Sequence, residues 1–280
     1  MNLKRSVILA LVFSALVATA GVGAPAEIRV WTTRAIATVL AEVGAEFERE
    51  TGHGLIISSD LPPAFLRRAN AGEPFDVLIT GSSPLDEWIR DGRIVASSRS
   101  VIARSGIGVE VRAGAAKPDI SSVEAFKRAL LNARSIAFLR VGSGMYLADL
   151  LERLGIAGAI APKVTRPETD IVSELVAKGE IELGMTVITQ IMTTPGVELV
   201  GPLPADVQSY VTFVAGVGSE SKIPEAGRQL ITFLTGPRAV AVIKAQGMEL
   251  APTEKGVGSH AKICVRRNLH ETRPLFFAGV

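Results

Sequence analysis

The sequence is poor in cysteine, histidine and aromatic residues, and each shortage excludes a class of protein. Its 280 residues include 1 cysteine, which excludes an internal disulfide framework and a cysteine-rich metal site. Aromatic residues make up 5%, too few for the stacking platforms that bind single-stranded nucleic acids. The net charge of +2 gives no support for a nucleic-acid partner. With 48% hydrophobic and 21% charged residues, general disorder is also excluded.

The motifs of common hydrolases, zinc peptidases and nucleotide-binding proteins are missing as well. Ser143 does not stand in a G-x-S-x-G pattern, and the chain has no H-E-x-x-H, P-loop or G-x-G-x-x-G sequence. His53 lies between two glycines, whereas His260 and His270 lie near the C-terminus, so a Ser-His-Asp triad is not expected. Cys264 would need an activating base to act as a nucleophile. We therefore expect a binding protein rather than an enzyme, with no cofactor and no metal.

The N-terminal segment has the pattern of a secretory signal peptide. Lys4 and Arg5 precede an uncharged apolar run at 7–20, which is shorter than the roughly 20 residues of a membrane span. Small residues follow, and cleavage after Ala26 is favoured, which makes 1–26 the signal peptide. An N-terminal membrane anchor is the alternative. We predict an exported protein of the bacterial periplasm.

Short apolar segments alternate with amphipathic helical segments along most of the chain. The predicted strands lie at 28–31, 55–58, 75–79, 107–112, 135–139, 163–166, 181–187, 197–200 and 211–217. The predicted helices lie at 35–51, 63–71, 86–91, 145–154, 169–178, 224–234 and 237–246, with a further start at the capping-box pair Ser121 and Glu124. This alternation predicts an α/β fold whose mainly parallel sheets have helices on both faces.

The alternating pattern forms two blocks that meet twice, near 101–108 and near 208–216. Two crossings predict two lobes joined by a hinge. The expected division is 27–104 with 213–252 for lobe 1, 105–212 for lobe 2, and 253–280 for a poorly ordered tail. A reading-frame change or an appended segment would explain the change of character in the tail. Because ligands of open α/β sheets bind outside the carboxyl ends of the strands, the ligand cleft is expected between the lobes.

Several motifs follow one another in a distinctive order within residues 27–250. They are FERETGHG at 47–54, RANAGEPFDVLITGS at 68–82, LLERLGI at 150–156, VAKGEIELGM at 176–185 and ITFLTGPRAVAVIKAQGMEL at 231–250. In this order they resemble the molybdate-type periplasmic solute-binding proteins of ABC transporters. The resemblance implies a type II periplasmic-binding fold that closes on a small ligand and delivers it to an inner-membrane permease.

Three positions depart from the ligand set that this resemblance implies. Ala35 and the Leu-Pro-Pro segment at 61–63 fall where the family has serine donors, and Val187 falls where it has a tyrosine. Arg34 adds a charge whose two-pronged geometry suits a carboxylate better than a tetrahedral oxyanion. The predicted ligand is therefore a small organic carboxylate or sulfonate, and a molybdate- or tungstate-type oxyanion is the alternative.

The predicted ligand-binding residues lie mainly in loops that lead into helices, where backbone amides and the helix dipole favour an anion. They are Thr32, Thr33, Arg34, Ser59, Ser143, Gly144, Met145, Thr169, Thr186 and Gln190. Each has a structural alternative. The threonines and Ser59 could cap helices or form turns, Arg34 and Gln190 could face solvent, and Met145 could belong to the core.

The favoured function is capture of a small anion for an ABC permease by a monomeric protein. A sensor module that presents its liganded form to a different partner keeps the same fold and is one alternative. A secreted hydrolase that uses Ser143 is the other.

Overall fold

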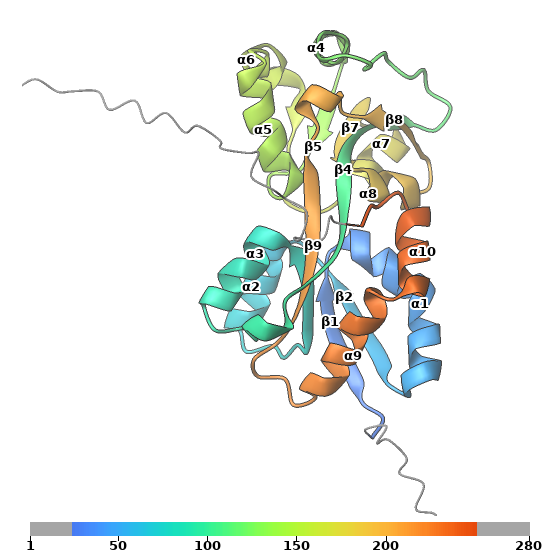
Figure 1. Cartoon of the computed structure of the whole chain (residues 1–280). Helices are drawn as coiled ribbons and strands as arrows, with labels where there is room; N and C mark the ends of the chain where they lie inside the picture. The colour runs from blue at the N-terminus through green and yellow to red at the C-terminus, as the bar shows by residue number, and fades with distance from the viewer. Residues whose placement is uncertain (1–23, 251–280) are drawn as a thin grey trace, which may run out of the picture.

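The computed structural model describes residues 24–250, and there the apolar segments of the sequence become the strands of a two-lobed α/β fold (Figure 1). Most of the predicted signal peptide and all of the predicted tail lie outside the described residues. The strands are β1 Glu27–Thr32, β2 Gly54–Ser59, β3 Val77–Gly81, β4 Ser100–Arg112, β5 Ile136–Phe138, β6 Val164–Thr165, β7 Leu183–Val187, β8 Val197–Pro202 and β9 Tyr210–Val217. Within 24–250 no helix is long and apolar enough to cross a bilayer.

The helices fill the segments between the strands, as the alternation predicts. They are α1 Arg34–Thr51, α2 Pro62–Asn70, α3 Ser82–Arg90, α4 Val123–Asn132, α5 Ser143–Arg153, α6 Ala157–Ile160, α7 Val172–Lys178, α8 Ile188–Thr193, α9 Pro224–Leu234 and α10 Pro237–Ala245. Along α1 the apolar residues Val39, Val43 and Phe47 are buried at helical spacing, and the helix ends at Gly52 as expected.

Lobe 1 is a sheet with helices on both faces. β1 pairs in parallel with β2 and β3, and β9 continues the sheet next to β3 in the antiparallel direction. One face packs against α1, α9 and α10, where Ile28 and Val30 join the core. The other face packs against α2 and α3 (Figure 1). There Trp31 and Phe65 stack with ring centroids 5.7 Å apart. Apolar side chains on both faces explain why these strands read as continuous apolar runs.

Lobe 2 has its own parallel centre and its own core. β5 pairs in parallel with β6 and β7, and Val109, Phe126 and Leu147 belong to the main core of this lobe. The two parallel sets stand at the ends of one path, in the order β2-β1-β3-β9-β4-β7-β5-β6, with β8 beside β4. The lobes are thus parallel at their outer parts, as predicted, and antiparallel where they join.

Two strands, β4 and β9, connect the lobes (Figure 1). They pair with each other from Ser100 opposite Ala215 to Gly106 opposite Tyr210, and β4 then continues beside β7 and β8. The expected strand at 107–112 therefore begins earlier, at Ser100, because its first half belongs to lobe 1. The predicted lobe boundaries near 104 and 213 fall inside these continuous strands and remain predictions.

Several predicted element ends are wrong by a few residues. Ser122, not Ser121, caps α4, since its hydroxyl accepts from the amide of Ala125 at 3.2 Å. The helix predicted from Thr169 begins at Val172. The helix predicted at 86–91 begins at Ser82, where polar residues hid the first turn. Over stretches of only a few residues, capping residues and apolar periodicity do not locate the ends of a helix accurately.

Candidate ligand-binding site

The carboxyl ends of the parallel strands in both lobes lead into the helices that border the space between the lobes. In lobe 1, β1, β2 and β3 run into α1, α2 and α3, and in lobe 2, β5 and β7 run into α5 and α8. These are the edges where open α/β sheets bind ligands. The predicted site residues all lie at or near these edges.

The two lobes contact each other through apolar side chains. Leu61, just before α2 in lobe 1, is buried in a cluster with Leu139 and Val172 of lobe 2. Val187, at the end of β7, is buried with the lobe 1 core around α1 and α10. The described arrangement is therefore a closed one.

Charged side chains also meet across this space. Arg34, the first residue of α1, forms an ion pair with Glu174 near the start of α7. Burial raises the pKa of the Asp170 carboxyl above its ordinary value, although a hydrogen bond from Gln190 and the charge of Arg34 oppose the rise. Glu174 and Asp60 raise it further by repulsion. The α1 start, the β2–α2 loop and the segment before α7 thus lie within electrostatic reach of one another.

The lobe 1 side carries the predicted threonines. Thr32 is fully buried, and its carbonyl accepts from the amide of Asp60 at 3.1 Å, which ties the first two loops together. Thr33 stands at the N-cap of α1, but its hydroxyl makes no capping bond and is buried without a partner. The capping alternative is therefore wrong for Thr33, and its buried hydroxyl makes no hydrogen bond to the described residues. Ser59 is exposed at the end of β2.

The lobe 2 side includes the predicted glycine-rich turn. Ser143 is buried at the start of α5, and a Cβ on Gly144 would overlap the carbonyl of Leu139, so only glycine fits there. Met145 is 61% exposed, so the core alternative is wrong for this side chain. Thr169 is exposed in the loop before α7, and its carbonyl accepts from Ile171 at 2.9 Å. Ser59 stands opposite Thr32 in the parallel pairing of β2 with β1.

The last two predicted residues form a hydrogen-bonded chain that ends at a carboxylate. Thr186 donates to Gln190 at 3.3 Å, and Gln190 donates to Asp170 at 2.7 Å. Gln190 is 3% exposed, so the alternative in which it faces solvent is wrong. Because the amide fixes one oxygen of Asp170, this partly buried carboxyl has a defined orientation.

Sequence reasoning missed four residues of this region, namely Leu61 as a contact, Arg166, Asp170 and Glu174. Arg166 donates to the carbonyls of Arg140 at 3.2 Å and Gly144 at 3.4 Å, and its Nε is buried without a partner. The only available signal was the spacing of Asp170 and Glu174, which places two carboxyls one turn apart at a helix start. By contrast, Asp76 holds structure as expected, accepting from Arg29 and Ser221.

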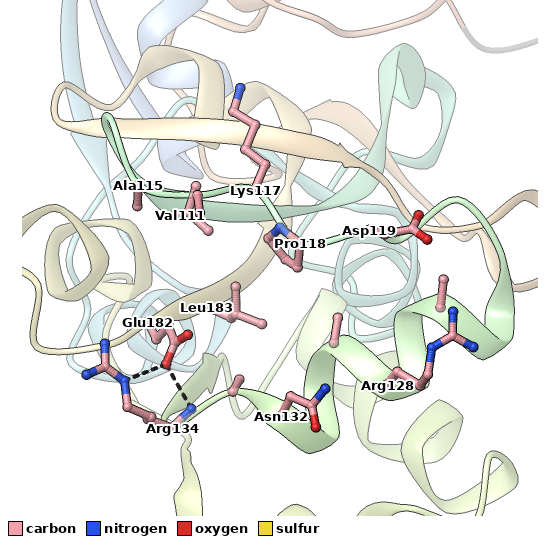
Figure 2. Close-up of a pocket in the computed structure, with 14 residues that line it drawn as sticks. Val111, Ala115, Lys117, Pro118, Asp119, Arg128, Asn132, Arg134, Glu182 and Leu183 are labelled. Carbon is pink, nitrogen blue, oxygen red and sulfur yellow. Dashed lines mark hydrogen bonds and ion pairs between the residues drawn. The ribbon is translucent and has the colours of Figure 1, made fainter.

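A hollow of about 560 Å³ lies on lobe 2, away from the predicted residues (Figure 2). Its charged side chains are largely paired within the protein, because Arg134 binds Glu182 at 3.0 Å and Lys117 binds Glu198 at 3.2 Å. Among the described residues, no group of three or more His, Cys, Asp or Glu side chains is arranged to hold a metal ion.

The two-lobed α/β fold is that of a solute-binding protein. The family model of the bacterial extracellular solute-binding proteins matches residues 28–249, and the chain belongs to this family. It is 32% identical to a protein named aconitate isomerase from Pseudomonas sp., over 77% of this chain and 84% of the relative.

The resemblance to molybdate-type solute-binding proteins of ABC transporters is confirmed. The chain is 22% identical to the molybdate-binding protein ModA of Escherichia coli, over 80% of this chain and 89% of the relative. The solved structure of the periplasmic molybdate-binding protein of Azotobacter vinelandii superposes with a TM-score of 0.68 at 22% identity, covering 80% of this chain and 100% of that one. The predicted type II periplasmic-binding fold is confirmed with it.

Proposed function

We propose that this protein captures a small organic carboxylate in the cleft between its lobes and delivers it to an ABC permease. The observation that carries the proposal is the pair between Arg34 and Glu174, in which a carboxylate from one lobe already lies on the guanidinium of the other. A guanidinium placed there can hold a ligand carboxylate through two parallel hydrogen bonds. The N-terminus of α1 and the free hydroxyl of Thr33 add further attraction for an anion.

The relative of higher identity favours a carboxylate, whereas the ModA relatives favour molybdate. The relative named aconitate isomerase shares 32% identity, compared with 22% for ModA of Escherichia coli. Ala35 and Val187 carry no hydroxyl, and Pro62 and Pro63 offer neither a side-chain donor nor an amide hydrogen. A tetrahedral oxyanion would therefore lose the hydroxyl donors that the molybdate-type family has at these positions. The periplasm, reached through the predicted signal peptide, is the proposed location, and a monomer is the proposed state.

A ligand screen on refolded protein tests this function. Unfolding and refolding remove any ligand carried through purification, and thermal unfolding is then followed with citrate, aconitate, succinate, a sulfonate, molybdate and tungstate. A ligand that binds only the folded state raises the midpoint temperature. We expect a rise with a di- or tricarboxylate. A rise with molybdate or tungstate alone, or with none of these, contradicts the proposal.

Arg34→Ala gives the matched test at the site. Loss of a charged hydrogen-bonding partner should weaken carboxylate affinity roughly 10- to 100-fold by calorimetry. The exposed Arg67 of α2 is the control, and Arg67→Ala should leave affinity unchanged. Equal affinities for the two variants would remove Arg34 from the site.

One observation favours a second candidate function, the isomerisation of an unsaturated carboxylate. Asp170 is a carboxyl with a raised pKa in the cleft, oriented by Gln190 at 2.7 Å. Such a carboxyl is a stronger base than an ordinary aspartate and could remove a proton from the CH₂ beside a double bond. Return of a proton to the far carbon of that double bond completes the shift, with no net change in atoms or electrons.

Incubation with cis- and trans-aconitate in D₂O tests this second function. Isomerisation through proton removal should interconvert the two compounds and introduce deuterium at carbon, and NMR detects both changes. Asp170→Asn should abolish turnover while the protein still binds, and the exposed neighbour Glu168→Gln should keep it. If the wild-type protein binds aconitate without interconverting it, the capture function stands alone.

A further inference from the structure

We infer that Glu174 is a built-in competitor, whose carboxylate occupies Arg34 and holds the lobes together until a ligand anion displaces it. This inference deepens the proposed function and rests on it for the identity of the displacing group. The pair joins the first residue of α1 in lobe 1 to the third residue of α7 in lobe 2.

The pair is well placed to stabilise the closed arrangement. The side chains of Arg34 and Glu174 are 35% and 34% exposed, so water only partly screens their attraction. The apolar contact of Leu61 with Leu139 and Val172 lies in the same inter-lobe region and excludes water. Among the described residues, Glu174 is the only ion-pair partner of Arg34.

The negative charge around the pair favours departure of Glu174 from Arg34 when a ligand anion binds. Arg34, Glu174 and Asp60 all act electrostatically on the carboxyl of Asp170. One oxygen of Glu174 is buried without a hydrogen-bond partner, so the pair leaves part of its carboxylate unsatisfied. A ligand carboxylate beside three protein carboxyls would be repelled unless one of them moved away. Glu174 is the carboxyl that a ligand replaces directly on Arg34.

The consequence is a reduced apparent affinity in the wild-type protein. A ligand has to compete with the closed state in which Glu174 occupies Arg34. Its apparent dissociation constant equals the intrinsic constant divided by the fraction of protein that is free to bind. Glu174→Gln removes the charge but keeps the size of the side chain. We expect this variant to bind citrate or aconitate about tenfold more tightly than the wild type.

The experiment measures lobe separation and affinity separately. Spin labels on Leu66→Cys of α2 and Asp149→Cys of α5, in a Cys264→Ser background, report the distance between the lobes without ligand. Glu174→Gln should shift this distribution to longer distances. The exposed Glu168, which pairs with Arg140 at 3.6 Å, provides the control Glu168→Gln, which should match the wild type.

Each result decides a different point. An unchanged distance distribution in a folded Glu174→Gln protein overturns the inference, whether or not a ligand is known. Longer distances with weaker carboxylate binding also overturn it, since Glu174 would then orient Arg34 rather than compete. If the wild-type protein binds no carboxylate, the proposed function fails, and the distance measurement still decides whether Glu174 holds the lobes together.

Discussion

Glu110 is the most unusual single side chain in lobe 2. It lies on β4 between Gly184 of β7 and Leu199 of β8, fully buried, and one carboxyl oxygen accepts from Ser173 at 3.0 Å while the other has no partner. Burial raises the pKa of Glu110 to about 7, against the opposing hydrogen bond from Ser173, and Glu174 and Asp170 add repulsion. The folded protein therefore favours the protonated form of Glu110 below a pH of about 7.

This raised pKa predicts a pH dependence of stability. Below pH 4.5, the pKa in the unfolded chain, the protonated carboxyl makes its full contribution to the stability of the folded state. This contribution is lost as the pH rises to about 7, the pKa in the folded protein. Glu110→Gln should therefore be more stable than the wild type at pH 8 by about 3 kcal/mol, with little difference at pH 4. Denaturant unfolding at several pH values measures this difference in the free energy of unfolding. Glu152→Gln, on an exposed face of α5, is the control, and a constant difference across pH would contradict the assignment.

Among the helices, the start of α5 depends most on one residue. Gly144 packs against the carbonyl of Leu139 with no room for a Cβ, whereas Gly158 of α6 has nothing within 4 Å of the same position. We expect Gly144→Ala to lower the free energy of unfolding by roughly 3 kcal/mol, because backbone has to move, and Gly158→Ala to be neutral or slightly stabilising. Thermal and denaturant unfolding compare the two. Similar stabilities for both variants would show that the turn adapts.

The sequence predicted the order of strands and helices well because apolar periodicity is local. The stripe of Val39, Val43 and Phe47 identifies α1 without any tertiary information. The loops of the candidate site were also predictable, since carboxyl ends of parallel strands meet at one edge. The pair of Arg34 and Glu174 was not, because its members are 140 positions apart and only the closed lobes bring them together. The antiparallel junction of β4 and β9 likewise depends on long-range pairing.

For the protein as a unit, the balance between open and closed lobes controls binding. Leu61 contributes an apolar contact that exists only when the lobes meet, since its neighbours Leu139 and Val172 belong to lobe 2. Leu61→Ala should destabilise the closed ligand-free protein by about 1.5–3 kcal/mol, the contribution of a buried leucine, and lower its unfolding temperature. Ligand affinity should change little, because the closed liganded form loses the same contact. Calorimetry and thermal unfolding separate these effects, with the exposed Leu66→Ala as control.

The pairing of β3 with β9 also has a consequence for biosynthesis. β9 follows all the strands and helices of lobe 2 in the chain, yet it completes the sheet that β1, β2 and β3 begin. A ribosome therefore releases the inserted lobe in full before the first lobe can acquire its missing strand and the helices α9 and α10. The early strands wait with an open edge throughout that interval, and such edges favour mispairing between chains. Translation speed and holding chaperones should therefore affect the yield of this protein more through lobe 1 than through lobe 2.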